Sequence, residues 1–156
     1  RGDRRGAAAA ALEAGALWEE KLSHDENALL RYRELLASPT ARAWLVELRP
    51  GGAPVGYALL DRAKLPLADL APTDFEVKRV YVFGQFQGGG LGRRLVERAR
   101  EDALALGATR LLLGVYAKND AAIGFYERVG FATCGHRRFQ VGLLTCDDRI
   151  MGMPLR

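Results

Sequence analysis

Four glycines, Gly88, Gly89, Gly90 and Gly92, lie within five positions of the 156-residue chain, in the stretch VFGQFQGGGLGRRL at 82–95. The residues before them are typical of a strand and those after them of a helix. Exposed backbone N–H groups and the positive end of the helix dipole therefore meet at this loop, which favours an anion such as a phosphate group. Three ligands fit: a nucleoside triphosphate, a dinucleotide, and a diphosphate carried on another molecule.

The residues around the glycines fit the first two ligands poorly. A nucleotide-hydrolysing loop ends in Gly-Lys-Ser/Thr, so that the lysine and the hydroxyl reach phosphate and magnesium, whereas this helix begins Leu91-Gly92-Arg93. A dinucleotide fingerprint opens an amino-terminal βαβ unit, with an acidic residue about 20 positions later. Here the loop lies in mid-chain, after a hairpin, with a different glycine spacing. The third ligand, a diphosphate on another carrier, is favoured.

The composition excludes several other classes of protein. Hydrophobic residues make up 49% of the chain and charged residues 27%, with a net charge of +4, as in an ordinary globular chain. We expect one domain over 1–156, with a frayed or truncated start at 1–20. No apolar run approaches the roughly 18 residues of a membrane span, and no basic stripe with interleaved aromatics indicates nucleic-acid binding. We expect neither a membrane nor a nucleic-acid partner.

The cysteines and histidines do not form a recognisable site. Cys134 and Cys146 have no metal-like or redox-like spacing, so we expect free thiols and a cytoplasmic protein. His24 and His136 lack partners at metal-binding spacing, and no metal is predicted.

Periodicity predicts the elements that position the glycine loop. Ser23 and Glu26 have the spacing of a capping box and start a helix at 23–36. A helix follows the glycines and ends near Gly107. Another begins at Asn119 or Asp120 and ends at Gly130. The expected strands and loop are a hairpin at 43–61, a loop at 62–74, strands at 75–82 and 110–116, and closing strands at 131–134, 138–144 and 149–155. This order predicts an α/β (α+β) domain with a mixed sheet.

Two motifs in this framework resemble a known family. Gln87-x-x-Gly90-x-Gly92 is similar to the Gln/Arg-x-x-Gly-x-Gly/Ala pattern of the GNAT acetyltransferase superfamily, which binds the pyrophosphate of acetyl-coenzyme A. The stretch NDAAIGFYERVGF at 119–131 resembles that family's Asn-x-x-Ala-x-x-Phe-Tyr-x-x-x-Gly-Phe signature. The resemblance covers residues 43–155 and implies the GNAT fold, a mixed central β-sheet with helices on both faces. RVYV, LGVYAKN and RFQVGLLTCDDRIMGMPL look most like the PaiA-type polyamine (spermidine/spermine) acetyltransferases.

The resemblance also implies a set of residues that bind acetyl-CoA. Asn119 is expected to hydrogen-bond the pantetheine arm or to cap its helix, and the two roles are compatible. The complete expected set is Val80, Tyr81, Val82, Gln87, Gly88, Gly89, Gly90, Leu91, Gly92, Arg93, Asn119, Ala122, Phe125 and Tyr126. Of the two neighbouring arginines, Arg93 and Arg94, one must point away from the ligand on a helix.

Acetyl transfer to an amine requires a proton acceptor, an oxyanion donor and a proton donor. Glu76 matches the position where some superfamily members place a general base; the alternative is a solvated strand residue paired with Lys78 or Arg79. A backbone N–H of the strand, foremost that of Val82, could hold the oxyanion if the strand splays away from its neighbour, as the resemblance implies. Tyr126 is the general acid by resemblance, whereas its neighbour Phe125 is expected to be a core residue.

We therefore expect an N-acetyltransferase that moves an acetyl group from acetyl-CoA to a primary amine, by direct transfer in a ternary complex. The expected acceptor is a small molecule or a polyamine. The alternatives are a protein N-terminal or lysine acetyltransferase and, from another class, a non-catalytic acyl-CoA-binding module. Family habit suggests a homodimer.

Overall fold

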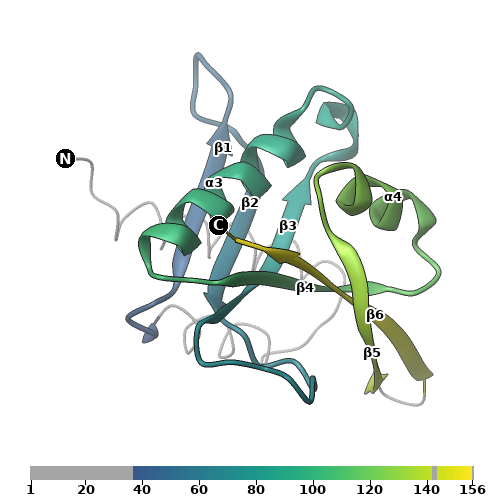
Figure 1. The fold of residues 1–156 in the computed structure, drawn as a ribbon. Helices are drawn as coiled ribbons and strands as arrows, with labels where there is room; N and C mark the ends of the chain where they lie inside the picture. Colours follow the sequence, from purple (N-terminus) through teal and green to yellow (C-terminus); the bar gives the residue numbers. More distant parts are fainter. Residues whose placement is uncertain (1–36, 142–143, 156) are drawn as a thin grey trace.

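The computed structural model describes residues 37–141 and 144–155, which form one six-stranded sheet with two helices (Figure 1). The predicted start at 1–20 and the predicted helix at 23–36 lie outside the described residues. The elements in chain order are β1 (Arg42–Glu47), β2 (Pro54–Arg62), β3 (Asp74–Val82), the 3-10 turn η1 (Gly84–Phe86), α3 (Leu91–Ala105), β4 (Arg110–Tyr116), α4 (Asp120–Arg128), β5 (Ala132–Val141) and β6 (Leu144–Pro154).

The strand order is β1-β2-β3-β4-β6-β5, and the sheet is mixed, as predicted. Neighbouring strands are antiparallel except for β3 and β4, which are parallel and are connected through α3. This parallel pair is short: only Asp74, Phe75 and Glu76 of β3 pair with β4, opposite residues 110–112. Both strands continue well beyond these residues, and Figure 1 shows them diverging. The predicted splay is therefore present in the middle of the sheet.

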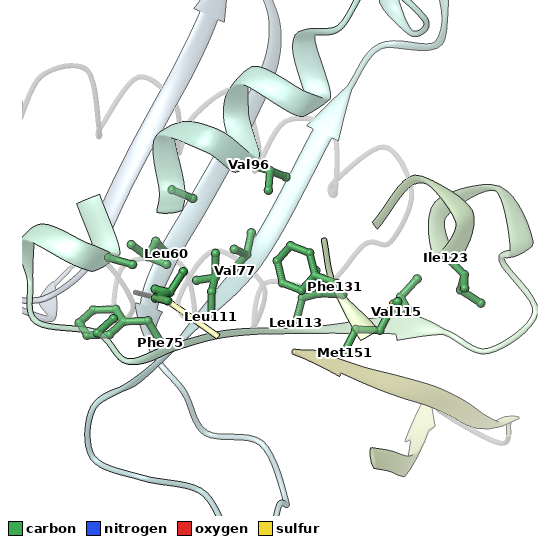
Figure 2. Close-up of a cluster of buried hydrophobic side chains, with 14 residues drawn as sticks. Leu60, Phe75, Val77, Val96, Leu111, Leu113, Val115, Ile123, Phe131 and Met151 are labelled. Carbon is green, nitrogen blue, oxygen red and sulfur yellow. The ribbon is translucent and has the colours of Figure 1, made fainter. Parts of the chain in front are cut away.

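The main core lies between the sheet and the two described helices. Phe75 and Val77 of β3 alternate toward this face, where Val96 of α3 and Ile123 of α4 belong to the same cluster (Figure 2). The opposite face carries a second buried cluster of Leu65, Leu112 and Ile150, against which leucines of the 63–73 loop pack. Both described helices thus cover one face of the sheet, so the helices expected on the second face are not among the described residues.

Local signals predicted the helix ends correctly. The amide N–H of Ala122 donates to the side chain of Asn119, the N-cap of α4, at 3.1 Å. Gly107 and Gly130 follow the two helices with φ of 79° and 102°, a backbone conformation in which glycine avoids the steric cost of a side chain.

The closing strands differ from the prediction. The segments 131–134 and 138–144 were expected as separate strands, but β5 runs without a break over Ala132–Val141, and β6 begins at Leu144. The cause is a register shift between Thr133 and Gly135, where Cys134 is the extra residue of a bulge. A bulge inverts the alternation of side chains along a strand, so the two halves are out of phase and resemble two strands.

Candidate functional site

A cavity of about 810 Å³ opens between the end of β3, the start of α3 and α4. These three elements come together in the upper part of Figure 1, beside the divergence of β3 and β4. Twelve of the predicted donor-site residues line the cavity: Val80, Tyr81, Val82, Gln87, Gly88, Gly90, Gly92, Arg93, Asn119, Ala122, Phe125 and Tyr126. Residues from three separate stretches of the sequence therefore surround one space.

The glycine loop leaves its backbone bare on the cavity side. Gly88 and Gly90 both have φ of 82°, and a Cβ at either position would meet no atom within 4 Å. Gly90 is the N-cap of α3 and contributes no side-chain cap. The first intrahelical bond here joins the Arg94 amide to the Gly90 carbonyl, at 3.1 Å. Helical geometry therefore leaves the N–H groups of residues 91–93 available to an anion.

Gly92 brings α3 and α4 close together. A Cβ at Gly92 would lie 3.4 Å from the Phe125 ring, so a side chain beyond a methyl group would push against α4. The two arginines after it diverge, as predicted: Arg93 lines the cavity, whereas Arg94 lines a different groove between α3 and β1.

Beyond Glu76, β3 and β4 no longer pair, and we call the space between them the gap. The backbone of β3 directs polar groups toward this gap. The Phe83 amide donates to the Val55 carbonyl of β2, at 3.0 Å. Successive residues of a strand direct their N–H and C=O groups to opposite edges of that strand. Since the groups of Phe83 point toward β2, the N–H and C=O groups of Val82 and Val80 point away from β2. Consistent with this direction, the Val82 carbonyl accepts a hydrogen bond from Gln87 Nε2 at 2.9 Å. These two residues thus present backbone groups where β3 has left β4.

Tyr126 lies on α4, with its ring among aromatic neighbours. The ring centroids of Phe125 and Phe131 are 5.1 and 5.8 Å from that of Tyr126, both in edge-to-face geometry. Burial raises the pKa of the Tyr126 phenol above its ordinary value of 10.0. A phenol in such a place stays protonated through the neutral range and can act as a proton donor.

Glu76 lies outside this cavity, on the opposite face of the sheet. Its neighbours Phe75 and Val77 point into the main core, so its own side chain points away from α3 and α4. Glu76 is buried, forms an ion pair with Lys78, and accepts a hydrogen bond from the Lys64 amide at 3.2 Å. The alternative of a solvated residue was therefore wrong about solvation, although it named the partner Lys78 correctly. Glu76 is the last β3 residue paired with β4 and so stands at the start of the gap.

Two predicted donor-site residues do not line the cavity, and three lining residues were missed. Gly89 is exposed, and Leu91 packs against the cluster of Ala58, Val82 and Leu95. The missed residues are Ala121, Arg128 and Val129. Arg128 and Val129 follow Phe125 by three and four positions, so the helical spacing of α4 could have revealed them.

Within residues 37–141 and 144–155, no three His, Cys, Asp or Glu residues are grouped so that they could hold a metal ion. Both cysteines there are free, as expected. Neither described helix has the length and apolarity needed to cross a bilayer.

Residues 8–131 match the Acetyltransferase (GNAT) family. The chain therefore belongs to this family and is an acetyl-CoA-dependent N-acetyltransferase. The predicted fold class and enzyme class are confirmed.

Named relatives agree with this class. The uncharacterized N-acetyltransferase Rv2669 of Mycobacterium tuberculosis is 32% identical over 121 residues, which cover 78% of this chain and 72% of the relative. The N-alpha-acetyltransferase RimI of the same species is 39% identical over 103 residues, covering 66% and 60%. Neither is named a polyamine acetyltransferase, so the PaiA-type subfamily stays a prediction.

Solved structures show the same fold. The ribosomal-protein-alanine N-acetyltransferase of Brucella melitensis has a TM-score of 0.66 and 26% identity, and the match covers 81% of this chain and 78% of that one. YncA of Salmonella typhimurium, solved with its cofactor acetyl-CoA, has a TM-score of 0.70 and 21% identity, covering 99% and 91%.

Proposed function

We propose that this protein transfers the acetyl group of acetyl-CoA to the primary amine of a small molecule, directly and within a ternary complex. One observation carries the proposal: twelve residues chosen from sequence motifs line a single cavity beside the splay of β3 and β4. A cavity of about 810 Å³ also lies in the range of roughly 300–1,000 Å³ that is typical of sites for small ligands.

The donor site fits the chemistry of acetyl-CoA. The amides of residues 91–93 and the bare backbone at Gly88 and Gly90 are suited to a diphosphate, with Arg93 supplying a positive charge. The outward-pointing backbone groups of β3 can hydrogen-bond the amide groups of a pantetheine arm.

Donor and acceptor would reach the gap from opposite faces of the sheet. The cavity lies on the side of α3 and α4, whereas Glu76 faces the other side. We assign Glu76 as the proton acceptor for the incoming ammonium, acting through water, because its carboxylate stands where the gap begins. Val80 and Val82 both direct N–H groups into the gap. Val80 is two residues, or about 7 Å, nearer to Glu76, so its N–H is the better placed donor to the developing oxyanion.

Tyr126 completes the reaction. As the amine forms its bond to the acetyl carbon and the carbon–sulfur bond breaks, the Tyr126 hydroxyl gives its proton to the departing thiolate. Glu76 keeps the first proton of the ammonium and later releases it to solvent. The second proton that the nitrogen loses passes through water to the Tyr126 phenolate, so the products are an amide and a free thiol and the phenol is restored.

Replacing Tyr126 by phenylalanine tests this assignment. We expect kcat to fall by about 10²-fold, because a positioned proton donor is lost, while KM for acetyl-CoA changes little. Thiol release with a panel of primary amines gives the rates. In the wild type, any fall in rate that ionisation of the Tyr126 phenol causes should occur above pH 10.0, because burial raises the pKa of that phenol. Undiminished transfer by the variant would rule out the acid assignment.

Two outcomes of the same assay would favour other functions. Acetyl-CoA binding without transfer to any amine would indicate a non-catalytic acyl-CoA-binding module. Preferred transfer to peptide amino termini would indicate a protein N-terminal acetyltransferase, which the similarity to RimI supports.

Initial rates at varied acetyl-CoA and amine concentrations test the ternary complex. Intersecting double-reciprocal lines are expected for a ternary complex, whereas parallel lines would indicate a covalent enzyme intermediate.

A further inference from the structure

The acceptor side of the site can be characterised from the sheet face that turns away from α3 and α4, which we call the acceptor face. Side chains alternate along a strand. Val80 and Val82 pack in a cluster with Leu95 of α3, so the side chain of Tyr81 between them points to the acceptor face. Tyr81 also lines the cavity between β3, α3 and α4, here called the donor cavity, on the other side of the strand. In the same way Val115 belongs to the main core, and Tyr116 points to the acceptor face.

The carboxylates on this face already have partners. The buried charged residues of the described chain are all acidic, and strand alternation puts each of them on the acceptor face: Asp61, Asp74, Glu76 and Asp148. Asp74 pairs with Arg110 at 2.6 Å, Asp148 with Arg137 at 2.8 Å, and Glu76 with Lys78.

Asp61 differs from these three because its partners are hydroxyls. It accepts hydrogen bonds from Ser38 at 2.9 Å and Thr40 at 2.6 Å, and it is only 3% exposed. A second ammonium on an acceptor would need a carboxylate of its own to offset its desolvation. In the described part of this face, three of these carboxylates are paired with cations, and Asp61, whose partners are neutral hydroxyls, is almost closed to solvent.

The face instead exposes two aromatic rings on either side of the gap. Large hydrophobic side chains that are exposed in the described residues include Tyr81, at 38%, and Tyr116, at 46%. Tyr81 lies beyond the last β3 residue that pairs with β4, and Tyr116 ends β4. The Tyr81 ring is held in place, with the centroids of Tyr57 and Phe83 at 5.9 and 5.6 Å. Aromatic rings of this kind bind apolar and aromatic groups well.

We propose that the acceptor is a small primary monoamine with an aromatic or apolar body, which lies between Tyr81 and Tyr116 while its amine reaches the gap. This assignment rests on the proposed function and narrows it. It disfavours a polyamine, whose additional positive charges would meet only carboxylates that are paired with cations or, at Asp61, closed to solvent.

Pentylamine and 1,5-diaminopentane form a matched pair, because they differ only in the second ammonium. We expect kcat/KM to be roughly tenfold or more lower for the diamine than for pentylamine, and highest for 2-phenylethylamine. A diamine or spermidine used as well as pentylamine would overturn the proposal. So would an alanine-initiated tetrapeptide used better than 2-phenylethylamine.

The role of the rings is tested with Tyr116→Ala, because Tyr116 is not one of the residues that line the donor cavity. We expect KM for 2-phenylethylamine to rise about tenfold and KM for acetyl-CoA to stay unchanged. Leu104→Ala is the matched control, since Leu104 is also an exposed hydrophobic residue, at 36%, but lies on α3. An equal effect of both variants, or no effect of Tyr116→Ala, would contradict the assignment.

Calorimetry separates this inference from the proposed function. With CoA present, 2-phenylethylamine should bind the wild type more tightly than 1,5-diaminopentane and should bind Tyr116→Ala more weakly. That result, even without transfer to any amine, would support the acceptor assignment while contradicting the proposed function. Equal binding of both amines would overturn the acceptor assignment.

Discussion

At the scale of single residues, Glu76 shows how a buried acidic side chain finds a partner inside a sheet. It lies at a bulge: Leu59 and Leu60 of β2 pair with Arg79 and Val77 of β3, so Lys78 is the extra residue. Residues two apart on a strand lie on the same face, and the Lys78 ammonium contacts the Glu76 carboxylate. The buried carboxylate therefore has a positive partner on its own strand.

Replacing Glu76 by glutamine tests the role of this carboxylate. The shape is kept but the proton acceptor is lost, so we expect kcat/KM for the amine to fall by about 10²-fold. Calorimetry should show unchanged affinity for acetyl-CoA, because Glu76 lies outside the donor cavity.

Lys64→Gln is the matched control for Glu76→Gln. It removes an exposed charge nearby but keeps the backbone amide that donates to Glu76. A glutamine variant as active as the control would exclude Glu76 as the base.

At the scale of elements, the proposed donor site depends on how the glycine loop starts α3. Gly90 has φ of 82° and ψ of 0°, a left-handed conformation in which it directs the chain from the loop into the helix. A side chain in this region costs roughly 1–2 kcal/mol. Glycine at this position therefore lets the loop present bare amides without that cost.

Gly90→Ala is accordingly expected to lower the free energy of unfolding by about 1–2 kcal/mol and to weaken the binding of acetyl-CoA. Urea denaturation and calorimetry measure the two effects. Gly84→Ala is the control, because Gly84 lies in the same connection, has no left-handed φ and leaves open space around a Cβ. If both variants behaved alike, the backbone conformation of Gly90 would not be the cause.

At the scale of the whole molecule, the donor cavity joins elements that are distant in the sequence. β3, α3 and α4 each contribute residues to it, and they meet where the central parallel pair of strands opens. A ligand that contacts all three elements binds only the folded chain and must stabilise it by mass action.

We expect acetyl-CoA at 100 times its Kd to raise the free energy of unfolding by about 2.7 kcal/mol. S-acetylpantetheine at the same concentration should stabilise less, because it lacks the diphosphate for which the glycine loop is suited. Thermal unfolding followed by circular dichroism measures both. Equal stabilisation by the two ligands would show that the loop does not bind the diphosphate.

The parts of this protein that the sequence predicted are those governed by neighbouring residues. The Asn119 cap, the glycine ends of both helices and the bare loop before α3 depend on backbone conformations that only certain residue types adopt within one turn. The sequence alone therefore determined the donor-site motifs and the order of the elements around them.

Only the tertiary structure decided features that depend on the pairing of distant strands. The bulge at Cys134 lies inside one continuous strand where two strands were expected. Tyr81 and Tyr116, 35 positions apart, came to the same face beside one gap. Register and burial arise from contacts across the whole sheet, and a one-residue shift moves a side chain to the other face. Local patterns therefore could not reveal them.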